Sequence, residues 1–325
     1  MFKGAGSALF MLSLAWTACP PTVWAAGTGE GSESILFGDI PSVYGASKYD
    51  QSVDEAPASV SIITAAEIRR YGYRTLGDIL RGVRGLYVSY DRNYTYVGVR
   101  GFSRPTDYNS RVLITLDGHR TNENIYHMAM VGTEALIDVD LIDRVEVIRG
   151  PSSSIYGTSA FFAVVNVITK RGRDYKGGEV AAEYGSLNTR AVSATYGNRS
   201  PEGTELLVSA RTYASDGHDR LYYSEFDAPA TNNGIAENLD KNRARNAFFK
   251  ASAGDITLTA AMVSRHKQVP TASFDSLFNN PHQATNDQQG FVSLAYDREV
   301  GRQSRLNLWL SFDSYRYDGT YANAF

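Results

Sequence analysis

Residues that could catalyse a reaction or bind a metal are present, but their spacing does not fit such sites. No Gly-x-Ser-x-Gly motif is present to hold a nucleophilic serine. The turn at 150–158 contains the glycines of a phosphate-binding loop, but no Gly-Lys-Ser/Thr follows it. The histidines show no metal-ligand spacing: they are His119, His127, His218, His266 and His282. The sequence therefore predicts no catalytic site, no metal site and no cofactor.

Aromatic and polar side chains gather in two segments that we expect to form exposed loop tips. Tyrosine combines a rigid apolar ring with a hydroxyl group, so such tips can contact a ligand at small entropic cost. The alternative is that the rings fill interior space or lie at an interface. The candidate ligand-binding residues are Tyr90, Arg92, Tyr94 and Tyr96 in the first segment and Asn122, Asn124, Tyr126 and His127 in the second.

Two arginines, Arg100 and Arg149, each follow an apolar strand and precede a glycine. This position carries the guanidinium to the edge of a domain, where a carboxylate partner is needed to offset its desolvation. The alternative is that each side chain lies along the domain surface.

The elements that position these residues have clear local signals between 55 and 172. Capping boxes at 64–67 and 75–78 predict two short helices, the second ending before Gly85. Asp117-Gly118 behind an apolar strand predicts a hairpin. Two apolar runs, around 145–148 and 160–168, flank a tight serine-rich loop. Together with strands at 60–63, 86–90, 95–99 and 112–116, these signals predict a small α+β domain.

Three motifs in this region resemble the plug domain of TonB-dependent outer-membrane receptors. They are Val97-Gly98-Val99-Arg100-Gly101-Phe102, Val112-Leu113-Ile114-Thr115-Leu116-Asp117-Gly118, and the run 143–172 with its Arg149-Gly150-Pro151 turn. Many members of that family have a Gly-Gly pair where this chain has Phe161-Phe162-Ala163. The resemblance implies that Arg100 and Arg149 pair with glutamates of the barrel wall and lock the plug in place.

After 172 the pattern changes to alternating apolar and polar residues in strands long enough to cross a membrane. We predict seven strands, near 179–185, 190–196, 205–213, 247–253, 256–263, 291–297 and 305–313. Short connections alternate with long polar ones at 214–245 and 264–290, which is typical of an outer-membrane barrel with its short turns in the periplasm. Seven strands do not close such a barrel, so we expect 173–325 to be its first part, and the chain to be an N-terminal fragment.

The first 54 residues have a different composition. Residues 1–25 have the pattern of a signal peptide, with Val23-Trp24-Ala25 as the cleavage site. The only cysteine, Cys19, lies within it. Residues 26–54 are predicted to be flexible. The resemblance implies that a short box there pairs as a strand with TonB, and our candidate is Glu33-Ser34-Ile35-Leu36-Phe37. The alternative is a linker with an incidental apolar triplet.

With 32 basic and 35 acidic residues, the charge gives no indication of nucleic-acid binding. The resemblance implies a receptor in the outer membrane of a Gram-negative bacterium, in contact with lipid. It would transport a scarce small molecule or metal chelate, such as an iron-siderophore complex or cobalamin, with energy supplied through TonB. The alternative is a surface receptor or adhesin that binds without transport.

Overall fold

The computed structural model describes residues 42–43, 51–52, 59–103, 106–301 and 304–323, all within one compact unit. The signal peptide predicted at 1–25 and the candidate TonB box at 33–37 lie outside these residues. Within the segment predicted to be flexible, β1 (Ser42–Val43) and β2 (Gln51–Ser52) form a short antiparallel pair. The described residues contain no helix that is long and apolar enough to cross a membrane.

A small α+β domain follows, as predicted. Its main sheet has the order β3-β8-β9-β6-β7, in which only β6 and β9 are parallel. The strands of this sheet are β3 (Ser59–Thr64), β6 (Val112–Leu116), β7 (His119–Arg120), β8 (Ile142–Arg149) and β9 (Ala163–Thr169). A separate hairpin pairs β4 (Leu86–Tyr90) with β5 (Thr95–Val99). Asp117 and Gly118 both have positive φ, which confirms the predicted turn between β6 and β7.

The helices of this domain begin at the predicted caps. Thr64 caps α1 (Ala65–Tyr71) and Thr75 caps α2 (Leu76–Arg81), each within a complete capping box. The second helix ends at Gly82, three residues before the glycine that we expected to stop it. The loop between β8 and β9 is more than a tight turn, because it contains the one-turn helix α3 (Ser153–Tyr156). The 3-10 turns η2 (Val139–Leu141) and η3 (Gly172–Asp174) lie on either side of the β8–β9 pair in the chain.

A row of polar side chains crosses the main sheet of the small domain. Glu146 on β8 is fully buried and accepts hydrogen bonds from Arg144 Nε (3.0 Å) and from Asn166 Nδ2 (3.1 Å) on β9. Asn166 Oδ1 accepts from Thr115 Oγ1 on β6 at 2.7 Å. The row therefore crosses three adjacent strands, on the face of the sheet that also carries the buried Leu113, Ile148 and Val164.

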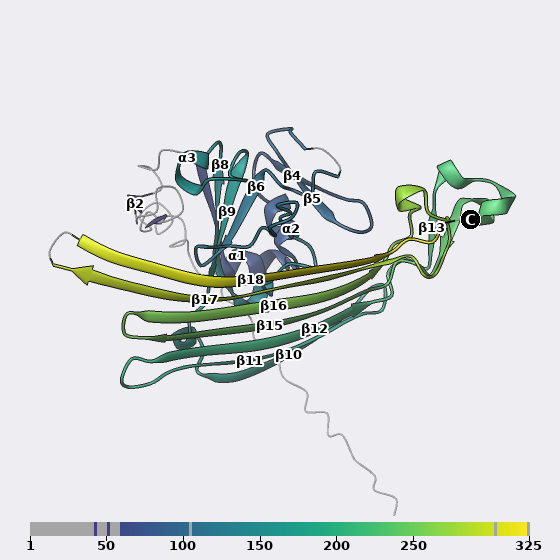
Figure 1. Cartoon of the computed structure of the whole chain (residues 1–325). Helices are drawn as coiled ribbons and strands as arrows, with labels where there is room; N and C mark the ends of the chain where they lie inside the picture. The colour runs from purple at the N-terminus through teal and green to yellow at the C-terminus, as the bar shows by residue number, and fades with distance from the viewer. Residues whose placement is uncertain (1–41, 44–50, 53–58, 104–105, 302–303, 324–325) are drawn as a thin grey trace, which may run out of the picture. The chain divides into compact units, whose positions relative to one another are not determined.

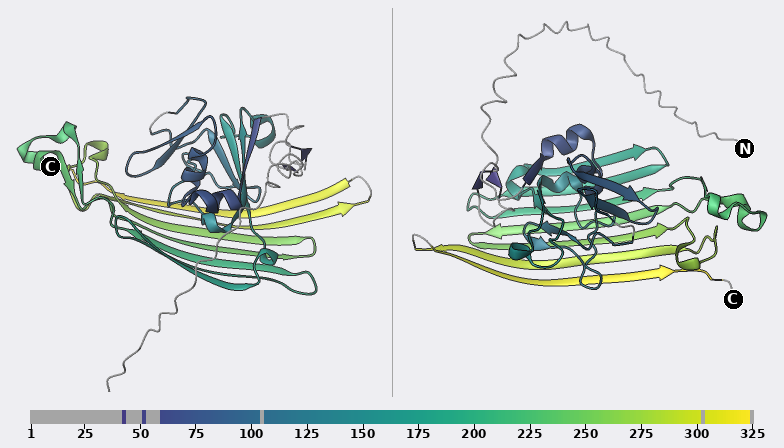
Figure 2. Two further views of the ribbon diagram at one scale, coloured as in Figure 1. Left: turned by 180° about the vertical axis from the view of Figure 1, so that it is seen from behind. Right: turned by 90° about the horizontal axis from the view of Figure 1, so that it is seen from above.

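Seven antiparallel strands then form a curved sheet in chain order (Figures 1 and 2). All seven strands that we predicted are present, and all are longer than expected: β10 (Gly177–Gly185), β11 (Thr189–Arg199), β12 (Glu205–Ser215), β15 (Asn242–Ala253), β16 (Ile256–Gln268), β17 (Ala284–Val300) and β18 (Ser304–Thr320). The largest extensions, on β15, β16, β17 and β18, are at the long-loop ends, where the sequence is mostly polar and the alternation of apolar residues is lost.

The two long loops lie at one end of this sheet. The first contains the hairpin of β13 (Arg220–Tyr222) and β14 (Ile235–Glu237) and the turns η4 (Ser224–Phe226) and η5 (Pro229–Gly234). The second contains η6 (Ser273–Asp275). The rings of Phe226 and Phe278 stack with centroids 4.3 Å apart, and Asn279 Oδ1 accepts from Glu237 N at 3.0 Å. The two loops therefore pack on each other.

The two faces of the sheet differ in chemistry. On β18, Leu306, Leu308, Leu310 and Phe312 point outward and are 43%, 55%, 71% and 73% exposed. The alternating positions Asn307, Trp309, Ser311 and Asp313 point toward the small domain, which lies against this inward face (Figure 2). An apolar outer face and a polar inner face are the pattern of a membrane barrel wall.

We expect Leu310→Arg to destabilise the sheet by about 2–4 kcal/mol, because it places a charge near the middle of the apolar outer face. The variant Asn307→Arg adds the same side chain to the inward face and serves as the control. Its loss in the free energy of unfolding should be much smaller. The free energy of unfolding in lipid vesicles, measured by denaturant titration, checks this prediction. Equal losses for the two variants would contradict the assignment of the faces.

Candidate functional site

The loop between β7 and η2 is held in shape by two buried side chains. Asn122 Nδ2 donates to the carbonyl oxygens of Val112 (3.0 Å) and His127 (2.9 Å). The Glu123 carboxylate accepts from three backbone amides, those of residues 125, 126 and 128. Asn122 is thus a structural residue rather than an exposed one, whereas Asn124, Tyr126 and His127 are exposed as predicted.

The turn between β4 and β5 places its residues differently from our expectation. Asp91 Oδ1 accepts from the amides of Asn93 (2.8 Å) and Tyr94 (2.6 Å), and Oδ2 accepts from the Tyr96 hydroxyl at 2.8 Å. Tyr94 and Tyr96 are only 7% and 3% exposed, so the prediction that they are exposed tips was wrong. Their rings fold back because the aspartate holds the turn closed. Tyr90 is exposed, and Arg92 is partly exposed.

An aromatic cluster joins the two loops, with Tyr108 at its centre. The Tyr108 ring lies 5.9 Å from Tyr94, 6.4 Å from Tyr96 and 6.3 Å from Tyr126 between centroids. Met128 and Met130 pack below these rings. Only Tyr126, which is 68% exposed, presents most of its ring to solvent. The cluster is therefore a supported aromatic surface with one prominent exposed member.

The sheet contributes further rings on the long-loop side of this cluster. Tyr315 packs against it from β18, and the hydroxyls of Tyr317 and Tyr321 are hydrogen-bonded to each other. Phe274, from the second long loop, lies edge-on to Tyr321 at 5.2 Å. Burial and, next, the neighbouring Tyr321 raise the pKa of Tyr108, so its phenol stays protonated and remains a hydrogen-bond donor.

Beneath the rings lies a buried ionic network, which we call the Arg265 network. Arg265 on β16 is 2% exposed, and its Nη1 lies 3.2 Å from Asp287 Oδ2 on β17 and 3.5 Å from Glu134 Oε2 of the small domain. The Tyr94 hydroxyl donates to Asp287 Oδ1 at 2.9 Å, and the Arg265 guanidinium lies 5.2 Å from the Tyr94 ring centroid. Burial and then the Asp287 charge raise the pKa of Tyr94.

The network extends to the small domain's turn and to the base of the first long loop. Arg265 also donates to Asn93, whose Oδ1 accepts from Thr285 Oγ1 at 2.9 Å. Next to it, the buried Lys267 Nζ lies 2.6 Å from Asp240 Oδ1, and Arg92 Nη1 lies 3.5 Å from Asp240 Oδ2. Arg92 thus connects the small domain to the loop base.

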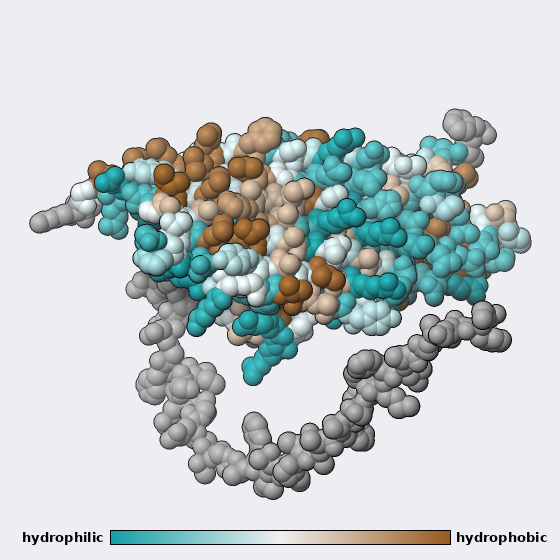
Figure 3. Space-filling view, turned by 90° about the horizontal axis from the view of Figure 1, so that it is seen from below, coloured by the Kyte–Doolittle hydropathy of each residue, from teal (hydrophilic) through white to brown (hydrophobic). Residues whose placement is uncertain are grey.

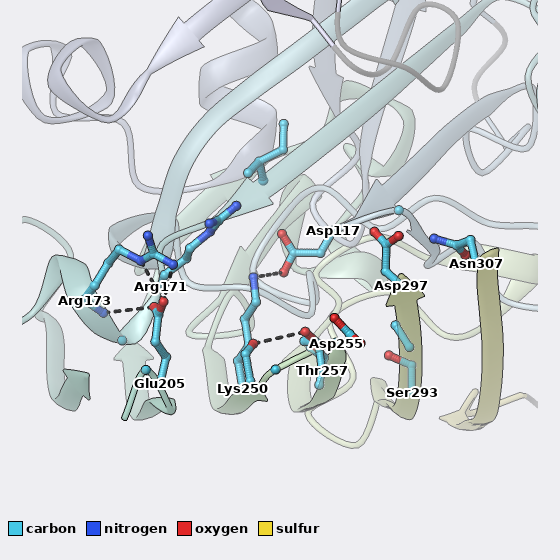
Figure 4. A pocket seen from close by; sticks show the side chains of 18 of the residues that line it. Asp117, Arg171, Arg173, Glu205, Lys250, Asp255, Thr257, Ser293, Asp297 and Asn307 are labelled. Atoms are coloured by element: carbon cyan, nitrogen blue, oxygen red, sulfur yellow. Dashed lines mark hydrogen bonds and ion pairs between the residues drawn. The ribbon is translucent and has the colours of Figure 1, made fainter. Parts of the chain in front are cut away.

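Two more ion pairs across the domain–sheet boundary have the same polarity, with the cation on the sheet. Arg211 on β12 pairs with Asp138 at 2.8 Å, and burial raises the pKa of Asp138 although Arg211 opposes this. Lys250 on β15 pairs with Asp117 at 2.8 Å (Figure 4). Sequence reasoning missed these pairs, since their partners lie far apart in the chain.

The predicted plug locks, Arg100 and Arg149, bond within the small domain in the part of the chain that the structure describes. Arg100 Nη2 donates to the carbonyl of Arg149 (3.3 Å). Arg149 donates to the carbonyl of Arg84 (2.6 Å) and to the hydroxyls of Ser59 and Ser61. Their pairing with wall glutamates stays a prediction.

Among the cavities between the small domain and the sheet, two border the loops and ion pairs described above. One of about 680 Å³, shown in Figure 4, is lined mainly by charged and polar side chains such as Arg173, Glu205, Lys250 and Asp297. The other, of about 460 Å³, is lined by loop residues including Asn124 and His127 and by Tyr315 of β18. Gly118 and Trp309 border both. Among the described residues, no group of three His, Cys, Asp or Glu side chains is placed to hold a metal ion.

Comparison with known proteins identifies the small domain. Residues 52–164 match the TonB-dependent Receptor Plug Domain family. This region contains the first two motifs, the Arg149-Gly150-Pro151 turn of the third, and both small-domain loops of the aromatic cluster.

Solved structures extend the similarity to the sheet. The ferric yersiniabactin uptake receptor of Yersinia pestis matches 82% of this chain with a TM-score of 0.62 and 17% identity, over 42% of its own length. The alcaligin outer-membrane receptor of Bordetella pertussis matches 85% of the chain with a TM-score of 0.56 and 20% identity, also over 42% of its length. The pyoverdine receptor of Pseudomonas aeruginosa bound to pyoverdine matches 84% of the chain with a TM-score of 0.59 and 16% identity, over 40% of its length.

The chain thus spans about two fifths of the length of the structures that it matches. These likenesses confirm the predicted fold class, an α+β domain followed by the first strands of an open barrel.

We expect Asp287→Ala to destabilise the domain–sheet contact by about 3–5 kcal/mol, because it leaves the buried Arg265 with one carboxylate fewer. Asp287→Asn keeps an oxygen that accepts from the Tyr94 hydroxyl, so it should destabilise the domain–sheet contact less than Asp287→Ala does. Amide hydrogen exchange of residues 93–94 measures the change.

The control for this experiment is Asp255→Ala, which removes an ion pair to Arg298 at 3.7 Å between two exposed side chains. Asp255→Ala should destabilise the protein by less than about 1 kcal/mol. Similar exchange rates in the Asp287 and Asp255 variants would show that the Arg265 network does not hold the turn.

Proposed function

Because the chain carries a TonB-dependent receptor plug domain and the first strands of the receptor barrel, we propose that it is part of an active transporter of a ferric siderophore across the outer membrane. The observation that carries this proposal is the aromatic cluster, which covers the plug on the side of the long loops. The proposal places the plug domain at 55–172 and the barrel wall from 173 onward, with the long loops outside the cell.

The chemistry of the cluster favours a chelate of moderate size with planar or aromatic parts. Tyr108 and Tyr126 offer ring faces and hydroxyls, while Phe274 and Tyr321 provide further rings from the wall and its loop. The exposed Asn124 and His127 add polar contacts at the edge. The names of the matched structures, which concern yersiniabactin, alcaligin and pyoverdine, favour an iron chelate over cobalamin.

Transport requires energy, and we propose that it reaches the plug through TonB. The candidate contact is the segment 33–37, which would add a strand to TonB by β-augmentation. A pull on this segment acts on β3, the edge strand of the plug sheet, whose strand partner among the described residues is β8. The Arg265 network and the Arg211 and Lys250 pairs hold other parts of the plug against the wall, so the ligand surface stays supported until the plug is remodelled.

The second candidate function is a receptor that binds at the surface without transport. One matched structure is that of the FpvAI–pyocin S2 complex. The packed pair of long loops offers a surface for such a contact. A working TonB box distinguishes the two functions, because a binding-only receptor does not need it.

We expect Tyr126→Ala to weaken binding of the ferric siderophore about tenfold, because it removes the most exposed ring of the cluster. Tyr126→Phe keeps the ring and should bind within about threefold of the wild type. The control is Tyr71→Ala, since Tyr71 is 64% exposed but lies outside the cluster. Binding of radiolabelled ferric siderophore to whole cells gives the affinities. Equal affinity of Tyr126→Ala and the wild type would contradict a ligand site here.

We expect Ile35→Pro and Leu36→Pro to abolish uptake and to leave surface binding unchanged, because proline cannot donate a hydrogen bond to a strand partner. Thr28→Pro, in the same segment but outside 33–37, is the control and should transport normally. Accumulation of labelled siderophore is measured with and without the proton gradient.

The outcomes of that experiment separate the proposals. Unchanged uptake in both proline variants would remove the TonB box from 33–37. Binding without gradient-dependent uptake, in the wild type as well, would favour the binding-only receptor.

A further inference from the structure

The two cavities described above meet where the β6–β7 hairpin of the plug approaches the sheet. Gly118, at the tip of this hairpin, and Trp309 of β18 line both cavities. A Cβ atom on Gly118 would lie 3.9 Å from Cη2 of the Trp309 ring, so the glycine backbone and the ring are close neighbours. We call Gly118, His119 and Trp309 the hairpin contact. It lies between the cavity of about 460 Å³ on the long-loop side and the cavity of about 680 Å³ on the short-turn side.

His119 fixes the hairpin to the sheet. Its ring stacks on Phe291 of β17, with centroids 4.0 Å apart, and its Nε2 lies 2.8 Å from Asp313 Oδ1 of β18. Phe291 and Asp313 are opposite each other in the β17–β18 register, so the imidazole lies on one cross-strand pair. Just after the hairpin, the carbonyl oxygen of Thr121 accepts from Gln289 Nε2 at 2.6 Å. These contacts keep the hairpin against the sheet.

The hairpin is the weaker side of this contact. In the described sheet, β7 is an edge strand, and it pairs with β6 through Thr115–Arg120 and Leu116–His119. In contrast, β18 pairs with β17 along its full length. Asp117 accepts from the amide and the hydroxyl of Thr169 on β9, so it can stay in place while residues 118–120 move. The hairpin can therefore leave the sheet while β6 keeps its parallel pairing with β9.

The chemistry of the two faces of the sheet places a route for a charged molecule on the inward side. The outward face carries a broad hydrophobic area (Figure 3), which disfavours contact with charged groups. The larger cavity is lined by basic and acidic side chains in similar number, among them Arg171, Arg199 and Glu202. Such a mixed lining accepts a hydrophilic ligand without binding it tightly, and passage requires both properties.

We propose that the hairpin contact is a gate, and that a hydrophilic, charged chelate passes through it from the smaller cavity to the larger one when β7 moves away from β18. The plug then stays within the barrel with its main sheet assembled, and it opens at this edge. The inference rests on the transport function proposed above, for which it supplies the route. It gives residues 118–120 a role that ligand binding at the aromatic cluster does not use.

The test is the KCl current through the complete protein in planar lipid bilayers, which needs neither a siderophore nor TonB. We expect His119→Ala/Gln289→Ala to raise the mean current about tenfold, because the loss of two polar contacts and a ring stack increases the population of the open hairpin. Trp309→Ala should raise the current as well, since it removes the wall side of the gate and leaves the plug unchanged. The control is Arg74→Ala, which removes an ion pair of the plug with Glu183 of β10, at 3.8 Å, and should carry the wild-type current.

A second experiment distinguishes a local gate from a plug that moves as a whole. The variant His119→Cys/Asp313→Cys removes the polar contact and allows a short bismaleimide to link β7 to β18. We expect a high current before linking and the wild-type current after it. In the His119→Ala/Gln289→Ala background, a link between Arg74→Cys and Glu183→Cys ties the plug to the sheet at another place and should leave the current high. Swelling of liposomes in raffinose, measured on the same proteins, reports whether the opening admits a molecule larger than an ion.

Three outcomes would overturn the inference. A wild-type current in His119→Ala/Gln289→Ala or in Trp309→Ala would show that the hairpin contact does not close a passage. Closure of the current by the Arg74–Glu183 link would show that the plug moves as a whole. A current without swelling in raffinose would restrict the opening to ions and exclude a chelate. Absence of siderophore uptake by the wild type would contradict the transport proposal but would not change these currents, so the two failures are distinguishable.

Discussion

The guanidinium of Arg265 lies almost wholly out of water, and the position of the plug depends on how this charge is neutralised. A buried cation of this kind is tolerated only with well-placed carboxylates and acceptors. The sheet supplies one carboxylate, Asp287, while the plug supplies Glu134 and the acceptors of Asn93. Neither part alone satisfies the guanidinium. The Arg211–Asp138 and Lys250–Asp117 pairs repeat the arrangement at other points of the boundary.

This constraint links the ligand surface to the plug's attachment. Tyr94 has its ring in the aromatic cluster and its hydroxyl on Asp287, so one side chain belongs to both. Arg92, from the same turn, reaches Asp240 at the base of the first long loop. If the proposed ligand shifts Tyr108 or Tyr94 on binding, it acts on the groups that neutralise Arg265. The closed Asp91 turn, which buries Tyr94, makes this connection possible.

Local signals in the sequence predicted the fold well. The capping boxes at Thr64 and Thr75, the Asp117-Gly118 turn and the alternation along β18 each depend on neighbouring residues alone, and the structure has all of them. The site was harder to predict. The Tyr94–Asp287 bond joins residues 193 positions apart, and it exists only because the register of β16 and β17 turns Arg265 and Asp287 inward together. Arg100 and Arg149 were expected to lock the plug, but the ion pairs that the structure shows at this boundary use other residues, with the cation on the sheet at Arg265, Arg211 and Lys250 and on the plug at Arg92.

The polar row of Thr115, Asn166 and Glu146 has a consequence for the chain before it folds. Strands β8 and β9 contain Val-Glu-Val-Ile and Val-Val-Asn-Val-Ile, so without Glu146 and Asn166 both would be uninterrupted β-prone apolar runs. Such runs stack readily into cross-β aggregates when they are exposed. In the folded plug these two side chains are hydrogen-bonded to each other. In the unfolded chain each of them interrupts an aggregation-prone segment. The same residues therefore protect the nascent domain from self-association until its sheet is assembled.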